Sequence, residues 1–205
     1  GGDERGSHTL TGNEDFPICV PIASQCLHAT GVAHAFQYRK QQRAVLTTIG
    51  DGGTSEGDFY EAINVAGAWK LPVVFAINNN QWAISVPLSE QTHSQTLAQK
   101  AIAAGIEGRQ VDGNDVIAMR QVVREALDKA RSGEGPTLIE ALTFRLCDHT
   151  TADDATRYQP EEAVIQAKQQ EPLLRLQQYL MTQGLLSDSD RQTIHQHCQQ
   201  EVDKA

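Results

Sequence analysis

Short apolar runs alternate with longer amphipathic segments through most of the chain. The apolar and partly β-branched runs predict four strands, at residues 44–49, 71–77, 108–113 and 136–144. Apolar residues at helical spacing predict four helices, at residues 21–38, 56–70, 96–105 and 116–133. Strands that alternate with helices through short joints pair in parallel through right-handed crossovers. We therefore predict an α/β fold, an open and mostly parallel sheet with helices on both faces.

Residues within and beside these segments refine the prediction. Asn114 or Asp115 can cap the helix that follows, and Gly105 is placed to close the helix before it. In segment 56–70 the apolar residues lie largely on one face, which predicts that this face is buried; they are Phe59, Ile63, Val65, Ala66 and Trp69.

The last third of the chain has a different pattern. Residues 146–162 are polar and contain a proline, which predicts a long functional loop. Two helices are expected in the C-terminal segment 171–205, at 171–183 and at 188–204, and Gly184 ends the first of them.

Length and the N-terminal residues bear on domain organisation. A chain of 205 residues suits one domain, so we expect residues 1–205 to form a single unit. The first residues are polar and glycine-rich and lack an initiating Met, which suggests a fragment whose upstream part is missing.

Charge and cysteine content exclude some classes of protein. A formal net charge of −9 with scattered lysines and arginines argues against nucleic-acid binding. No apolar run reaches the roughly 20 residues that a membrane span needs. The cysteines lack metal-ligand spacing and no signal peptide is evident, which predicts packing residues in a reduced, cytoplasmic protein; they are Cys19, Cys26, Cys147 and Cys198.

Candidate chemistry lies where two predicted strands end. Asp51 stands between glycines after the first strand, and Asn78 to Asn80 follow the second. The carboxyl ends of neighbouring parallel strands meet at one edge of a sheet, where ligands bind. Asp and Asn oxygens suit Mg²⁺, which binds proteins together with phosphates. Backbone N–H groups of Gly52 and Gly53, with a helix beginning near Ser55, suit a magnesium-bridged diphosphate. A simple tight turn with a capped strand end is the structural alternative.

The same stretch resembles a known signature. GDGGTSEGDFYEAINVAGAWKLPVVFAINNNQWAISVP begins with Gly-Asp-Gly and reaches an Asn-Asn pair about thirty residues later, like the thiamine diphosphate motif. The chain more closely resembles the alpha subunit of the decarboxylating component of 2-oxo acid dehydrogenase complexes. NNNQWAISVP, QVDGND, GEGPTLIEALTFR and HTTADDATRY stand in that family's order. The similarity therefore covers essentially the whole chain.

The resemblance implies a set of binding residues. It implies that Mg²⁺ is held by the side chains of Asp51 and Asn80 and by the main-chain carbonyl of Trp82, whose side chain we expect in the core. It implies diphosphate contacts from Gly52, Gly53 and Asn78. It implies contacts with the middle of the cofactor from Val20 and Ile22. Some branched-chain relatives bind a potassium ion through the same segment, which would make Ser24 and Gln25 its side-chain ligands. Helix capping explains Ser24 and Gln25 equally well.

Residues of the polar loop are implied to act on substrate. His149 stands where the family places an active-site histidine that can orient a 2-oxo acid or move a proton. A solvated loop histidine is the alternative. Asp153 and Asp154 can accept from loop amides, and Arg157 can pair with a carboxylate to order the loop when cofactor is present.

The resemblance also implies partners and an activity. The family's alpha subunit works with a beta subunit in an α2β2 heterotetramer and passes an acyl group to a lipoyl domain of the acyltransferase. The chain alone is expected to be inactive, because the beta subunit supplies a glutamate to the site. Pyruvate is the expected substrate, with oxidative decarboxylation as the reaction. The alternatives are a branched-chain 2-oxo acid dehydrogenase, an acetoin dehydrogenase, and an assembly fragment that binds no cofactor.

Overall fold

A four-stranded parallel sheet forms the centre of the computed structural model, which describes residues 20–204. The strands lie in the order β1-β2-β6-β5, and all three pairings are parallel. Their bounds are Val45–Gly50 for β1, Val73–Asn79 for β2, Thr137–Leu142 for β6 and Glu107–Asp112 for β5. Each coincides with a predicted strand to within about two residues at its ends. The α/β prediction is confirmed.

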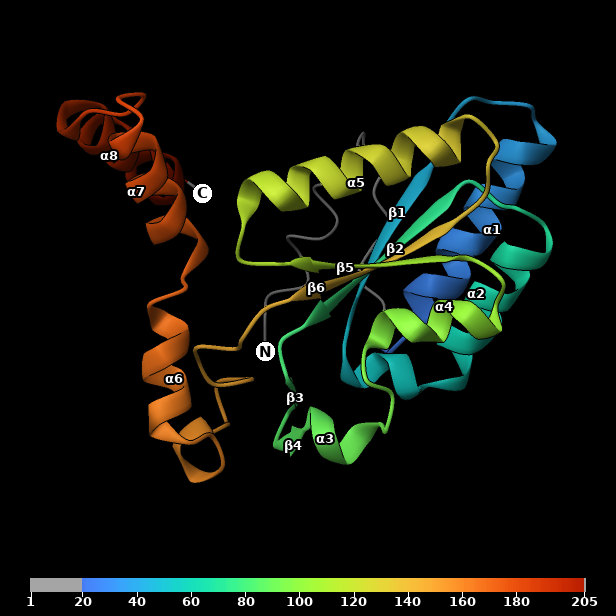
Figure 1. Cartoon of the computed structure of the whole chain (residues 1–205), viewed down its shortest axis with the longest axis horizontal. Coiled ribbons are helices and arrows are strands. Elements are labelled where there is room, and N and C mark those ends of the chain that lie inside the picture. The colour runs from blue at the N-terminus through green and yellow to red at the C-terminus, as the bar shows by residue number, and fades with distance from the viewer. Residues whose placement is uncertain (1–19, 205) are drawn as a thin grey trace.

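Helices cover both faces of the sheet (Figure 1). On one face lie α1 (Ser24–Tyr38), α2 (Gly57–Ala68) and the short α4 (Lys100–Ala103) after the 3-10 turn η3 (Leu97–Gln99). On the other lies α5 (Val116–Arg131), whose N-terminus is capped by the Asp115 carboxylate.

Strand β2 shows why both faces are covered. Val73, Phe75 and Ile77 belong to the larger core with α1 and α2. Val74 belongs to a smaller core with Ala126 and Ala130 of α5. Successive side chains of a strand point to opposite faces, so an almost wholly apolar strand needs a layer on each side.

Two helix predictions need correction. Trp69 is 55% exposed, because α2 ends at Ala68 and Lys70 turns the chain with φ 50°. The Trp69 ring lies 5.0 Å from that of His34 instead of in the core. The segment predicted as one helix over 96–105 is instead a 3-10 turn followed by a single turn of α-helix, closed by Gly105 at φ 66°.

Residues 80–91, which we call the strap, leave the end of β2 and return to the sheet edge. The strap contains the short strands β3 (Trp82–Ala83) and β4 (Val86–Pro87), followed by the one-turn helix α3 (Leu88–Gln91). Gln81 at φ 73° and Ile84 at φ 55° produce the reversals that fold it. The hydrophobic pattern did not predict these elements because two-residue strands have no periodicity to detect.

The C-terminal helices extend away from the sheet (Figure 1). Helices α7 (Pro172–Thr182) and α8 (Asp188–Lys204) match their predicted ranges, and Gly184 has the expected positive φ of 67°. A third helix, α6 (Glu161–Lys168), was missed. It is short and has no buried residues, so its sequence carries little amphipathic signal.

The cysteine prediction is partly wrong. Cys26 is buried, whereas Cys147 and Cys198 are exposed, and Cys19 lies outside the described residues. Burial raises the pKa of the Cys26 thiol to about 12. Within residues 20–204 there is no helix with the length and apolar character that crossing a bilayer requires.

Candidate functional site

The two predicted strand ends lie side by side. In the β1–β2 ladder Gly50 is opposite Asn78, which places Asp51 beside the residues that follow β2. Asp51 is only 1% exposed. Its carboxylate accepts from Gln91 Nε2 at 3.1 Å and faces the backbone N–H of Asn80. The structure therefore brings the Asp51 carboxylate to the backbone of Asn80, the other residue whose side chain is expected to bind a metal.

The Asp51 carboxyl group has an altered proton affinity. Burial raises its pKa above the ordinary 3.8, while hydrogen bonds from Gln91 and from the backbone of Asp51 and Asn80 oppose that rise. The nearby Arg145 charge opposes it further. Burial dominates, so the ionised carboxylate is an incompletely compensated charge that a cation would stabilise.

The backbone of Trp82 provides a third oxygen. Asn80 Oδ1 accepts from the Trp82 N–H at 3.1 Å, which joins the two residues in a tight turn. Trp82 is paired with Pro87 in the small β3–β4 sheet. The Leu88 N–H donates to the Gln81 carbonyl, so the neighbouring Trp82–Pro87 pair is a non-hydrogen-bonded pair of the antiparallel ladder, and the Trp82 carbonyl receives no donor from the opposite strand. A carboxylate, an amide oxygen and a carbonyl are the hard ligands that Mg²⁺ prefers.

The Trp82 side chain differs from its prediction. It is half-buried, and its ring centroid lies 5.4 Å from that of Tyr158 in the polar loop. The expected core position is wrong, because the strap carries Trp82 out of the sheet and toward that loop.

The glycine turn after Asp51 is a short 3-10 helix, η2 (Gly52–Ser55), and α2 begins only at Gly57. The predicted helix start near Ser55 therefore agrees to within two residues, with the 3-10 turn η2 in front of it. The first N–H groups of a helical turn have no partner within that turn, which leaves those of Gly52 and Gly53 without an acceptor inside it. A Cβ on Gly53 would lie 2.7 Å from Ile49 Cγ1 and 3.1 Å from Ile22 Cγ2. Ile22 thus lies directly beside this turn.

A buried lysine supports the turn from behind. Lys100 is 6% exposed and donates to the Thr54 carbonyl at 2.7 Å and to Thr54 Oγ1 at 3.0 Å. Thr54 Oγ1 in turn donates to the Asp51 carbonyl at 2.7 Å. Sequence reasoning missed Lys100, because a single lysine in a helical segment gives no signal of burial.

Two buried polar atoms beside Asp51 lack partners. Among the residues that the structure describes, Gln91 Oε1 and Arg145 Nη1 are buried side-chain atoms without a hydrogen bond. Buried polar groups in native proteins are almost always satisfied, so an unpaired acceptor and an unpaired donor here suggest an absent ligand. These atoms and the hard oxygens fit a hydrated, magnesium-bridged diphosphate.

Gly52 provides a direct test of the packing at this turn. A Cβ there would lie 2.5 Å from Ala83 Cβ, so Gly52→Ala must displace the strap. We expect a loss of about 1–3 kcal/mol in the free energy of unfolding, measured by urea denaturation. Gly57→Ala is the control, since nothing lies within 4 Å of its added methyl. That variant should gain up to about 1 kcal/mol. Equal stability of the two variants would contradict the close contact with Ala83.

The polar loop is tied to the strap by Arg145. Its Nη2 donates to the Ile84 carbonyl at 2.7 Å and to the Tyr158 hydroxyl at 2.6 Å. That hydroxyl donates to Asp153 Oδ2, which also accepts from the His149 N–H at 2.8 Å. Through Asp153, Tyr158 and Arg145, the backbone of His149 is therefore linked to the region beside Asp51. His149 itself is exposed.

An ordering role for Arg157 was expected with cofactor bound, and it stays a prediction. Arg145, which sequence reasoning did not single out, links the loop to the strap through the Tyr158 hydroxyl and the Ile84 carbonyl. Asp154 accepts from Thr156 N–H and Asp153 from His149 N–H, as expected for loop amides.

The other asparagines have separate surroundings. Asn78 is exposed, and its Oδ1 accepts from Thr143 Oγ1 at 2.6 Å. Asn79 is buried and donates to Glu140 Oε1 at 2.7 Å, so it is part of the core. Of the three asparagines, Asn79 therefore has a structural side chain, and Asn78 and Asn80 lie at the sheet edge.

The residues before α1 are largely exposed. Val20 is 75% and Ile22 63% exposed. Ala23 is the N-cap of α1, at φ 72°, and no side chain caps it, so capping does not account for Ser24. Gln25 instead donates from Nε2 to the Thr48 carbonyl at 3.1 Å.

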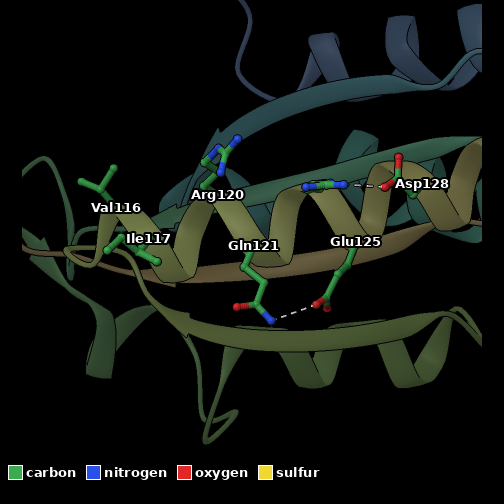
Figure 2. A pocket seen from close by; sticks show the side chains of 7 residues that line it. Val116, Ile117, Arg120, Gln121, Glu125 and Asp128 are labelled. Carbon is green, nitrogen blue, oxygen red and sulfur yellow. Dashed lines mark hydrogen bonds and ion pairs between the residues drawn. The ribbon is translucent and has the colours of Figure 1, made fainter.

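A surface hollow lies elsewhere. It has a volume of about 550 Å³ and follows the outer face of α5 (Figure 2). Its lining is mainly charged and amide side chains paired along the helix, such as Gln121 and Glu125 at 3.0 Å. None of the predicted site residues lines it.

Comparison with known proteins shows the family of this chain. The model of the family described as "Dehydrogenase E1 component" matches residues 1–205. The chain is 50% identical over 171 residues to the 3-methyl-2-oxobutanoate dehydrogenase subunit alpha of Mycobacterium tuberculosis (strain ATCC 25618 / H37Rv), covering 83% of this chain and 47% of that protein.

Two relatives carry a different name. The pyruvate dehydrogenase E1 component subunit alpha of Acholeplasma laidlawii is 43% identical over 202 residues, which is 98% of this chain and 59% of that protein. The protein of the same name from Staphylococcus aureus (strain N315) is 45% identical over 187 residues, 91% of this chain and 50% of that protein. The chain spans about half the length of the curated relatives it matches.

Proposed function

Because the chain belongs to the dehydrogenase E1 component family, we propose that it forms part of the alpha subunit of a thiamine diphosphate-dependent 2-oxo acid dehydrogenase. The single observation that supports this most is the pairing of Asp51 with Asn80 at neighbouring strand ends, beside unsatisfied polar atoms. The proposed reaction is oxidative decarboxylation of pyruvate, with transfer of the acetyl group to a lipoyl domain.

The proposed cofactor site uses the residues already described. Asp51, Asn80 and the Trp82 carbonyl would hold Mg²⁺. Backbone N–H groups of Gly52 and Gly53 would bind the diphosphate, helped by Asn78. When bound, thiamine diphosphate supplies a nucleophilic carbon that adds to the 2-carbonyl and an electron sink for decarboxylation. The protein contributes the metal, the orientation and the surrounding charge.

The hydrophobic side of the proposed site is formed by the segment before α1. Ile22 borders the glycine turn, which supports packing of Ile22 against the cofactor, with Val20 as its backbone neighbour. A potassium ion at Ser24 and Gln25 remains part of the proposal. Its support is the resemblance of the segment alone.

His149 is proposed to act on the substrate. Residues 146–162 are the proposed active-site loop. The backbone N–H of His149 is anchored by Asp153, and His149 itself is exposed. The imidazole of His149 can orient the carboxylate of a 2-oxo acid or transfer a proton at the carbonyl oxygen of that substrate.

The proposed site is shared with a partner. We assign that role to a beta subunit in an α2β2 heterotetramer, with the lipoyl domain of the acyltransferase as the acyl acceptor. The exposed apolar residues Val20 and Ile22 beside the turn support a covering surface from another chain. The isolated chain is then expected to bind cofactor weakly and to lack activity.

A reconstitution assay tests this proposal. Decarboxylation of pyruvate is measured for this chain alone, for the full-length alpha subunit alone, and for full-length alpha with beta. Only the last should turn over. Turnover by the isolated chain would contradict the two-subunit site. If none of the three gives a Mg²⁺-dependent thermal shift with thiamine diphosphate, the assembly-fragment alternative is supported instead.

A branched-chain substrate is the second candidate. The 50% identity to a 3-methyl-2-oxobutanoate dehydrogenase alpha subunit favours it. The two are separated by kcat/KM for pyruvate and for 3-methyl-2-oxobutanoate on the reconstituted heterotetramer. A higher value for the branched acid would replace pyruvate in the proposal, and turnover of acetoin alone would assign the chain to an acetoin dehydrogenase.

A further inference from the structure

Gln91 approaches the Asp51 carboxylate from a distant part of the sequence. It is the last residue of α3, and its Nε2 donates to Asp51 Oδ2 at 3.1 Å across 40 positions of the chain. The strap that carries it starts at Asn80 and is pinned back by the Leu88 N–H, which donates to the Gln81 carbonyl at 3.0 Å. The segment that follows one expected metal ligand thus returns to contact the other.

The orientation of the Gln91 amide is determined by its two hydrogens. Nε2 donates to Asp51 Oδ2 and also to the Val86 carbonyl, both at 3.1 Å. Rotating the amide by 180° would place Oε1 against a carboxylate and a carbonyl, which are both acceptors. Oε1 is therefore held on the opposite side.

The position of Oε1 is what points to a ligand. It is buried and has no hydrogen-bond partner among the residues that the structure describes. It lies 3.5 Å from the place where a Cβ on Gly52 would be, so it borders the glycine turn. A buried acceptor without a donor costs about 1–3 kcal/mol, and nearly all such groups in proteins have partners.

We propose that Gln91 is a positioning residue for the metal: its N–H orients Asp51, and its Oε1 accepts from a water molecule bound to the divalent cation. Mg²⁺ keeps several waters when few protein ligands hold it, and those waters are hydrogen-bond donors. Residues that orient metal ligands in this way affect metal affinity by about 10–100-fold. This inference rests on the proposed function, since it assumes that Mg²⁺ binds at Asp51.

The test compares Gln91→Met with the parent in the assembled full-length heterotetramer. Calorimetry gives Kd for Mg²⁺ at saturating thiamine diphosphate, and Kd for thiamine diphosphate at saturating Mg²⁺. We expect Gln91→Met to raise the first by about 10-fold or more and the second by less than about 3-fold. A merely structural effect would weaken both together. Gln42→Met makes the same change at an exposed glutamine and should alter neither.

A second variant and the parent enzyme separate failure of this inference from failure of the proposed function. Gln91→Glu keeps the shape and an acceptor but removes the N–H donor, so it tests the contact with Asp51 even if Gln91→Met fails to assemble. An unchanged Mg²⁺ Kd in an assembled Gln91→Met or Gln91→Glu enzyme overturns the inference, as does a parallel loss of both affinities. If the parent itself binds no Mg²⁺ with thiamine diphosphate, the proposed function fails instead.

Discussion

Replacing Asp51 with Asn should make the ligand-free chain more stable at neutral pH while removing Mg²⁺-dependent cofactor binding. The carboxylate is almost fully buried, and burial raises its pKa above the ordinary 3.8. Its ionised form therefore opposes folding. Asparagine can still accept from Gln91 but carries no charge. We expect a gain of about 1 kcal/mol, a typical size when a strained functional group is removed. For a chain of this length that is about 2–4 °C in Tm.

The pH dependence has a defined sign. A group whose pKa is raised on folding contributes stability below its unfolded pKa, and this contribution is lost as pH rises through its folded pKa. The Tm advantage of Asp51→Asn over the parent should therefore be absent near pH 3.5 and grow toward pH 7.

The measurement pairs thermal unfolding with cofactor binding. Asp51→Asn should lose Mg²⁺-dependent thiamine diphosphate binding by more than about 100-fold, since the amide lacks the charge that holds the cation. Asp203→Asn, at an exposed carboxylate, is the matched control and should change neither quantity. A variant that is less stable at pH 7, or one that binds Mg²⁺ normally, would contradict Asp51 as a destabilised metal ligand.

Replacing Glu140 with Gln should destabilise the fold by about 3 kcal/mol despite the nearly identical shape of the side chains. Glu140 is 1% exposed, and donors alone surround its carboxylate. Oε1 accepts from Asn79 Nδ2 at 2.7 Å, and Oε2 accepts from Ala98 N–H and from Gln110 Nε2, both at 3.0 Å. Hydrogen bonds to charged groups contribute about 1.5–3 kcal/mol each, and an amide nitrogen would face one of these donors.

Urea denaturation at pH 7 measures this effect. Glu134→Gln is the control, because that exposed carboxylate needs only an acceptor for Ser132 Oγ. It should stay within about 0.5 kcal/mol of the parent. A Glu140→Gln protein as stable as the control would mean that the carboxyl group is not held as an acceptor of three hydrogen bonds. We also expect weaker Mg²⁺ binding in Glu140→Gln, since Asn79 connects this network to Asn80.

The strands and long helices were predictable for a local reason. Apolar runs such as 71–77 and amphipathic segments such as 116–133 carry their period over many residues, so burial follows from sequence spacing. Asp115 and Gly184 acted at the predicted helix ends for the same reason, since capping depends on one residue and its immediate neighbours.

The features that were missed or misplaced concern residues whose surroundings do not follow from sequence spacing. Trp69 was placed in the core because its spacing continued the helical pattern beyond the residue where α2 ends. Arg145 was missed because its contacts span 61 positions to Ile84 and 13 to Tyr158. Spacing along the chain does not reveal such partners.

The sequence by itself determined the parallel α/β order, and with it the meeting of Asp51 and Asn80, because parallel neighbouring strands must end at the same edge. Only the tertiary structure decided which other side chains lie at that edge. The buried Lys100 and the partly buried Gln91 and Arg145 reach it from separate elements. Their roles depend on the fold of the strap, on desolvation and on hydrogen-bond direction, and these are properties of atoms brought together in space.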